Sequence, residues 1–180
     1  MVYIILGQGF EEIEAIAPCD ILRRGGVDVK LAAVGSSKSV SSGRGITVLA
    51  DVLTSDIVPE ADDTFVIPGG MGGVNSIKSD AETMKLIDSA AKNGALLAAI
   101  CAGPSVLAKL GLTDGKSITC YPGCEDLMGR ALCDTKKITV SEKGLITGRS
   151  AGSAIDFGLA ILAKLKGEKT AEKIRMDLVY

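Results

Sequence analysis

A cysteine at a sharp strand-to-helix turn is the residue in this sequence best placed to do chemistry. The apolar run 95–100 ends at Cys101, and Gly103-Pro104 opens a helical pattern over 105–111. Small residues at positions 99 and 103 let a strand turn tightly into a helix, which leaves the side chain at 101 exposed at the carboxyl end of the strand. The amides at the start of that helix favour a thiolate. We therefore expect Cys101 to be the nucleophile and the most acidic of the thiols, although cysteines are more often small buried hydrophobes.

Glu14 is the candidate proton donor and acceptor beside this thiol. The N-terminal dipole of the helix that follows is enough to explain the acidic residues Glu11 and Glu12, so no catalytic role is assigned to them. Glu14 differs because Pro18, four residues on, should disturb the helix where this carboxyl projects. Like charge and burial near a thiolate would push such a carboxyl toward its protonated form. Glu14 could then donate to the sulfur and act as acid or base toward a substrate.

The sequence contains no histidine. Cysteine proteases of the Cys-His type, Cys-His-Glu amidotransferases and Ser-His-Asp hydrolases all need an imidazole to move the proton. Those mechanisms are excluded, so Cys101 must act with a carboxylate, a tyrosine, the backbone or water.

Composition describes one globular domain over residues 1–180. The chain is 47% hydrophobic with 20 basic and 22 acidic residues, and its mean hydropathy is +0.32. This balance gives no indication of nucleic-acid binding. No apolar run approaches the ~20 residues of a membrane span, and Met1 leads into 2–6 without the features of a signal peptide, so we expect a cytoplasmic protein without a membrane partner.

The five cysteines form no evident disulfide framework, so reduced thiols are expected. Cys19, Cys120, Cys124 and Cys133 are interpreted as packing or surface thiols. No metal site is expected, because Cys120 and Cys124 lack a second ligand pair. The turn 7–9 resembles half of a dinucleotide fingerprint, but the third glycine is absent and acidic residues follow, so no nucleotide cofactor is expected.

Hydrophobic patterning predicts alternating strands and helices. Strands are expected over 2–6, 27–34, 63–67, 95–100 and 117–120, with a small hairpin or edge element near 46–49 and a hairpin of 137–141 with 145–147. Helices are expected over 10–24, 74–91, 105–111 and 125–128, and a last long helix should follow 153. Ser79 with Glu82, and Ser153 with Asp156, are the predicted capping pairs.

This alternation predicts an α/β fold, with a mostly parallel sheet covered by helices on both faces. Ligands of such sheets bind beyond the carboxyl ends of the strands. The segments 7–14 and 68–73 and the residue Cys101 all follow strands there, so we expect the site at that edge.

Four motifs in one order resemble the ThiJ/PfpI superfamily, and most closely its DJ-1 branch. They are Gly-Phe-Glu-Glu-Ile-Glu-Ala over 9–15, Pro-Gly-Gly over 68–70, Ala-Ala-Ile-Cys-Ala-Gly-Pro over 98–104 and Gly-Leu-Ile-Thr over 144–147. The resemblance runs from Met1 to Val179. It implies a flavodoxin-like three-layer sandwich with a nucleophile elbow, no cofactor, and a homodimer with the first helix near the contact.

The resemblance also implies a set of site residues. Cys101 matches the reactive cysteine and Glu14 the glutamate that hydrogen-bonds to its sulfur. The backbone amides beside the sulfur match Gly70 and Ala102, and an anion near the site would be bound by Arg24, Arg44 and Arg149. Tyr121 stands where many relatives have a histidine. Because a phenol is a poor base near neutral pH, Tyr121 is interpreted as a wall of the site.

Two functions remain open at this point. The first is a glyoxalase or deglycase acting on small 2-oxoaldehydes such as glyoxal and methylglyoxal, with Cys101 adding to the aldehyde and Glu14 moving a proton. The second is an oxidative-stress sensor or redox-regulated chaperone, in which Cys101 stops at the sulfinate. We favour the enzyme slightly, because a nucleophile, a proton shuttle and amide donors occur together.

Overall fold

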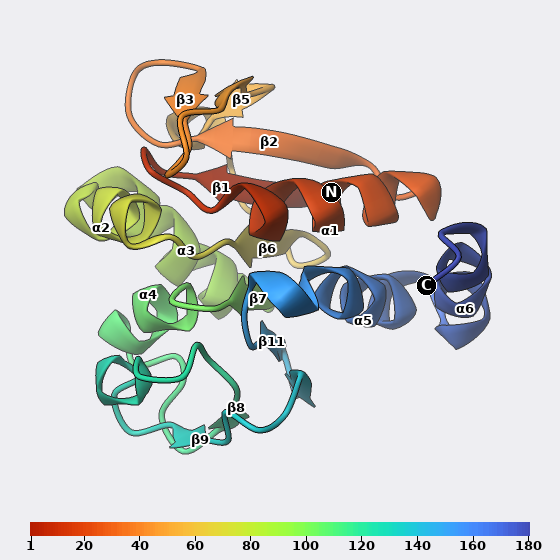
Figure 1. Ribbon diagram of the computed structural model, residues 1–180. Coiled ribbons are helices and arrows are strands. Elements are labelled where there is room, and N and C mark those ends of the chain that lie inside the picture. Colours follow the sequence, from red (N-terminus) through yellow and green to blue (C-terminus); the bar gives the residue numbers. More distant parts are fainter.

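The computed structural model describes all residues 1–180 and is built on one seven-stranded sheet (Figure 1). Its strand order is β10-β11-β7-β6-β1-β2-β5. Every neighbouring pair is parallel except β10 with β11. The strands are β1 (Val2–Leu6), β2 (Val29–Ala33), β5 (Val52–Leu53), β6 (Thr64–Ile67), β7 (Leu96–Ile100), β10 (Thr139–Glu142) and β11 (Leu145–Gly148).

Helices cover both faces of the sheet, each over its own hydrophobic cluster. One cluster joins the sheet to α1 (Glu12–Arg24), α5 (Ala154–Lys166) and α6 (Glu168–Asp177). The other joins it to α2 (Met71–Ser79), α3 (Ala81–Asn93) and α4 (Pro104–Lys109). Because the strands are buried on both faces, β6 and β11 are apolar or small throughout and completely buried. The predicted three-layer α/β fold is confirmed.

Two small sheets lie outside the central one. β3 (Ser39–Ser41) pairs antiparallel with β4 (Thr47–Leu49), which is the predicted hairpin near 46–49. β8 (Ser117–Ile118) pairs parallel with β9 (Leu132–Cys133) at the lower edge of the view in Figure 1. Short 3-10 helices occupy Thr54–Asp56, Glu125–Leu127 and Ala151–Ser153. The predicted hairpin of 137–141 and 145–147 is confirmed as β10 and β11.

The helix predicted over 74–91 is two helices. Asp80 lies between them with extended backbone, and its side chain accepts from the Thr83 amide at 2.7 Å. The predicted cap at Ser79 is therefore wrong by one residue, because Asp80 both ends α2 and begins α3. At the carboxyl end of the chain, Gly167 separates α5 from α6, a helix that the sequence analysis did not predict.

Helix α1 continues through Pro18, so the irregularity expected there does not interrupt it. Pro18 is buried against α5, with which α1 runs side by side in Figure 1. Gly158 makes this close approach possible, since a Cβ at that position would lie 3.0 Å from the Pro18 Cα. Packing against α5 thus stabilises a helix that lacks the Pro18 hydrogen bond.

The strand order places the carboxyl ends of β1, β6 and β7 side by side. After β1 the chain adds β2 and β5 on one side of this strand, and it then adds β6, β7 and β11 on the other side. Open α/β sheets commonly bind ligands at such a switch in strand order, which here lies between β1 and β6. No helix is both long and apolar enough to cross a bilayer.

Candidate active site

Cys101 occupies a strained elbow between β7 and α4. Its φ is 65°, which is rare for a residue with a side chain. The Cys101 amide donates to the Gly148 carbonyl at 2.9 Å, which fixes the turn against the end of β11. Gly103 is required two residues on, because a Cβ there would clash with the Ile67 carbonyl. The predicted nucleophile elbow is therefore present, and its strain holds the thiol at the carboxyl edge of the sheet.

Glu14 reaches this edge from the first turn of α1. The side chain of Glu11 caps the helix by accepting from the Glu14 amide at 2.8 Å, which sets the position of the turn. Glu14 is only 1% exposed. Its Oε2 accepts from the Gly69 amide at 2.8 Å, while Oε1 is buried without a hydrogen-bond partner at ordinary geometry. The carboxyl also interacts with the Cys101 thiol, so the structure brings the two predicted residues together.

Burial is the main cause of the unusual acidity of Glu14. It raises the pKa of the carboxyl to about 7, against smaller lowering contributions from Cys101 and the Gly69 amide. The direction agrees with the sequence analysis. Near neutral pH both the acid and the base form of the carboxyl are therefore accessible, which is the condition under which one group can both accept and donate a proton.

The acidity expected for Cys101 is wrong. Burial raises the pKa of the thiol well above its ordinary value, and the charge of Glu14 raises it further. The Ala102 amide hydrogen-bonds to the sulfur and opposes this, but burial outweighs it. Cys101 therefore rests as a thiol and needs a base at the moment of attack, and Glu14 lies beside it.

The titration of Glu14 predicts a pH-dependent stability. Its pKa of about 7 in the folded protein lies above the ordinary 4.5, so between these values the folded state binds more protons than the unfolded state. The free energy of unfolding then falls as the pH rises through this window, by at most about 3 kcal/mol from this group. In denaturant melts, Glu14→Gln should gain stability relative to the wild type between about pH 5 and about pH 8. If the difference in the free energy of unfolding between the two proteins did not change with pH, the raised pKa of Glu14 would be contradicted.

Of the two predicted amides, Ala102 interacts with the sulfur, and the Gly70 amide beside it stays a prediction. Gly70 precedes α2 and packs on the turn before α1, where a Cβ would lie 2.7 Å from the Glu11 amide nitrogen. The glycine that touches both reactive side chains is Gly69. A Cβ there would lie 2.6 Å from the Glu14 Oε2 and 2.8 Å from the Cys101 Cβ. Gly69 belongs to the Pro-Gly-Gly motif identified from the sequence, but its contact with Glu14 was not predicted.

The three arginines are placed differently. Arg24 pairs with Asp20 at 2.6 Å at the far end of α1. Ten residues of helix, about 15 Å, separate it from Glu14 of the same chain, and its role in binding an anion stays a prediction. Arg44 lines a cavity of about 350 Å³ over the starts of α1 and α2, and its amide donates to Glu12 at 2.8 Å. Arg149 follows Gly148, the residue that binds the Cys101 amide.

The backbone of Tyr121 is hydrogen-bonded to the backbone of Cys101. Its amide donates to the Cys101 carbonyl at 3.1 Å, and its side chain is 49% exposed. This placement fits the interpretation of Tyr121 as a wall of the site. No group of three or more His, Cys, Asp or Glu side chains is arranged to hold a metal ion.

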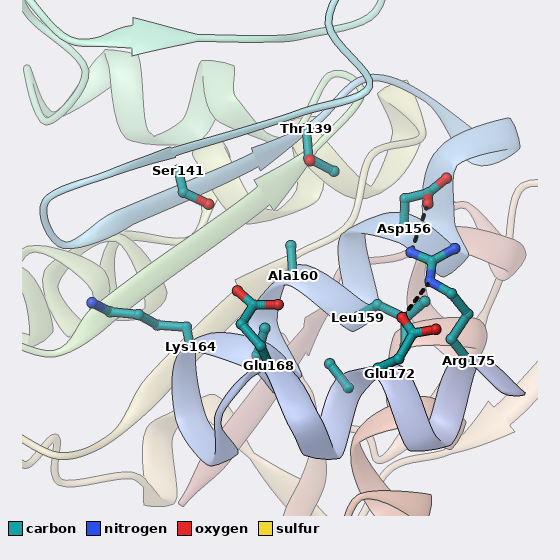
Figure 2. Close-up of a pocket in the computed structure, with 11 residues that line it drawn as sticks. Thr139, Ser141, Asp156, Leu159, Ala160, Lys164, Glu168, Glu172 and Arg175 are labelled. Atoms are coloured by element: carbon teal, nitrogen blue, oxygen red, sulfur yellow. Dashed lines mark hydrogen bonds and ion pairs between the residues drawn. The ribbon is translucent and has the colours of Figure 1, made fainter. Parts of the chain in front are cut away.

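A cavity of about 470 Å³ lies elsewhere, between β10, α5 and α6 (Figure 2). Its charged side chains largely pair with one another, since Arg175 bonds to Asp156 at 3.4 Å and lies 3.7 Å from Glu172. It contains no cysteine and no strained residue. The chemistry of the protein is therefore assigned to the edge with Cys101, which the larger cavity does not reach.

Comparison with known proteins gives one consistent result. A family model described as DJ-1/PfpI family matches residues 1–164. The protein dj-1beta of Drosophila melanogaster is 35% identical over 177 residues, which cover 98% of this chain and 95% of the relative. The glutathione-independent glyoxalase DJR-1.2 of Caenorhabditis elegans is 35% identical over 164 residues, 89% of this chain and 86% of the relative.

Solved structures agree with this result. The crystal structure of Drosophila melanogaster DJ-1beta superposes with a TM-score of 0.94 at 34% identity, covering 99% of this chain and 96% of that one. The flavodoxin-like architecture and the DJ-1 branch of the resemblance are both confirmed. With its strained cysteine, its buried glutamate and a match over nearly its whole length, this chain belongs to the DJ-1/PfpI family.

Proposed function

We propose that this protein is a cysteine-dependent glyoxalase that converts small 2-oxoaldehydes to 2-hydroxy acids without glutathione. The observation that carries the proposal is the contact between the Cys101 thiol and a buried carboxyl, Glu14, whose pKa lies near neutrality. A relative of 35% identity is named a glutathione-independent glyoxalase. The proposal extends to deglycase action on adducts of the same aldehydes.

In the proposed reaction with methylglyoxal, the Cys101 sulfur bonds to the aldehyde carbon as Glu14 accepts the thiol proton. That proton passes to the former aldehyde oxygen, which gives a hemithioacetal. Glu14 then removes the proton from the carbon attached to sulfur and returns it to the neighbouring carbon, while the hydroxyl proton on the sulfur-bearing carbon passes to the former ketone oxygen through an enediol. The product is a thioester of Cys101. Water cleaves the thioester, releasing lactate and restoring the thiol, so one water is consumed and no oxidant is needed.

The surroundings of the pair suit this sequence of proton transfers. The Ala102 amide already hydrogen-bonds to the sulfur and helps to stabilise negative charge there. Burial keeps competing water from the carboxyl, so the same proton can be returned to the substrate.

Lactate formation from methylglyoxal in glutathione-free buffer tests the proposal. The wild type should produce lactate, and Cys101→Ser should fall to the uncatalysed rate, because an alcohol is a far weaker nucleophile at neutral pH. Cys19→Ser is the matched control, since Cys19 is buried in α1 away from the elbow, and it should keep its activity. A wild type that produces no lactate would refute the glyoxalase and leave oxidation of Cys101 as the alternative function.

We further propose a homodimer in which α1 lies near the contact. Ile13 and Ile16 on this helix are 54% and 42% exposed, an unusual position for isoleucine. Light scattering should give about twice the chain mass, and replacing both isoleucines by serine should shift the protein toward the monomer. A wild-type mass near 18.5 kDa would contradict the dimer.

A further inference from the structure

Three cysteines outside the reactive pair gather around the small sheet of β8 and β9. In its register Ile118 lies opposite Cys133, and the Asp134 amide donates to the Ile118 carbonyl at 2.9 Å. Cys120 follows β8 by two residues, and Cys124 closes the turn after it, with its amide bound to the Tyr121 carbonyl at 2.9 Å. Cys120 and Ile118 belong to one hydrophobic cluster, and Cys124 and Cys133 pack against it.

Cys120 and Cys133 come together at this sheet, since Cys133 lies opposite Ile118, two residues before Cys120, and both side chains pack in the same hydrophobic cluster. The two side chains interact, and this interaction contributes to raising the pKa of the Cys120 thiol and acts to lower that of Cys133. Cys120 is fully buried, whereas Cys133 is partly exposed. The pair therefore has one thiol that a solute can reach and a second, buried thiol that interacts with it, which is the arrangement of a dithiol that can be oxidised stepwise.

We propose that Cys120 and Cys133 are a redox site that forms a reversible disulfide with a small disulfide such as oxidised glutathione as the oxidant. The Cys133 thiolate attacks one sulfur of the small disulfide, which leaves one small thiol free and Cys133 in a mixed disulfide. The Cys120 thiolate then attacks the Cys133 sulfur and displaces the second small thiol. The protein pair loses two electrons, and the two small thiols gain them together with the two protons.

The surrounding chain can accommodate this bond. β8 and β9 are two residues each and form a sheet separate from the central one. Most of the segment that the bond would enclose, 121–132, is exposed. Bringing the sulfurs to bonding distance therefore needs movement only in a peripheral region, not in the seven-stranded sheet.

The site is distinct from the proposed glyoxalase and does not rest on it, since neither Cys101 nor Glu14 takes part. The two are nevertheless joined through the backbone. Tyr121 directly follows Cys120, and its amide is bound to the Cys101 carbonyl. A disulfide between Cys120 and Cys133 would constrain both ends of the segment 121–132, which includes Tyr121.

The experiment uses the full chain with Cys101→Ser, which keeps the elbow thiol out of the exchange. The protein is incubated with oxidised glutathione, free thiols are blocked, and trypsin fragments are identified by mass spectrometry. Incubation lasts hours, because burial and nearby charges raise the pKa of Cys120 to about 12 and slow its attack. We expect peptide 117–130 joined to peptide 131–136, and reversal by dithiothreitol.

Two variants identify the sulfurs, because peptide 117–130 contains both Cys120 and Cys124. The crosslink should persist in Cys124→Ser and disappear in Cys133→Ser. Loss of the crosslink in Cys124→Ser would overturn the assignment in favour of Cys124. The redox site itself would be overturned if the reaction stopped at a stable mixed disulfide between glutathione and Cys133. It would also be overturned if no cysteine of the pair were modified. Neither result bears on lactate formation by the wild type.

Discussion

Replacing Glu14 by glutamine is expected to lower lactate formation from methylglyoxal by about 10²-fold or more, the usual scale for loss of a general acid and base. The fold should survive. Glutamine has the same shape, and its carbonyl oxygen can accept from the Gly69 amide as Glu14 Oε2 does at 2.8 Å. What glutamine cannot do is accept the Cys101 proton and return it to carbon. The measurement is the initial rate of lactate formation, with circular dichroism as a check on folding.

Alkylation of Cys101 separates this effect from damage to the nucleophile. The charge of Glu14 contributes to the raised pKa of Cys101, so Glu14→Gln should make the thiol more acidic and its reaction with iodoacetamide as fast or faster. Glu12→Gln is the matched control on the same helix turn and should keep its turnover. If Glu14→Gln turns over methylglyoxal at the wild-type rate, Glu14 takes no part in proton transfer.

Gly69→Ala is expected to lower turnover about as much as Glu14→Gln does. The cause is different, because the added methyl group would displace the reacting groups and would leave the proton acceptor present. The added methyl group would lie 2.6 Å from the Glu14 Oε2, 2.8 Å from the Cys101 Cβ and 3.1 Å from the Ala102 nitrogen. Something must move, and a displacement of about 1 Å at a reacting group can cost about 10²-fold in rate. Overpacking should also lower the free energy of unfolding by about 1–3 kcal/mol.

Gly152→Ala provides the comparison for this variant. Its added methyl group would meet only the Ser150 Oγ at 3.9 Å, an ordinary contact, in the 3-10 helix near the same edge. Kinetics and thermal melts of the two variants should diverge, with Gly152→Ala close to the wild type. Equal turnover in both would show that the contact of Gly69 with the reactive pair is unimportant for catalysis.

Most of the fold could be predicted because the buried strands are short apolar runs between clear turn residues. The strands β1, β6 and β7 fall where the sequence analysis placed them. The boundary at Asp80 was missed because the apolar stripe continues from α2 into α3 with helical spacing. Helix α6 was missed because it buries only Ala171 and Ile174, so its pattern has almost no apolar face.

The candidate site was predictable in its residues but not in its electrostatics. A glycine at 103 and a cysteine at 101 are enough to indicate an elbow. The acidity of Cys101 instead depends on how deeply the thiol is buried and how near Glu14 lies, and neither can be read from spacing. Arg24 illustrates a related point, since its distance from Glu14, ten residues of helix or about 15 Å, depends on the helix continuing through Pro18.

The hydrogen bond between the Gly69 amide and Glu14 links the end of β6 to α1. Glu14 and Cys101 are 87 residues apart in the chain, so the fold alone brings the carboxyl to the thiol. Before α1 docks, Cys101 is an ordinary thiol in water without its proton acceptor. The carboxyl reaches the thiol only when the first turn of α1 is in place, so a local opening of that turn separates the pair and interrupts the proposed proton transfer. The rate at which the Gly69 amide exchanges its hydrogen with solvent measures how often that happens.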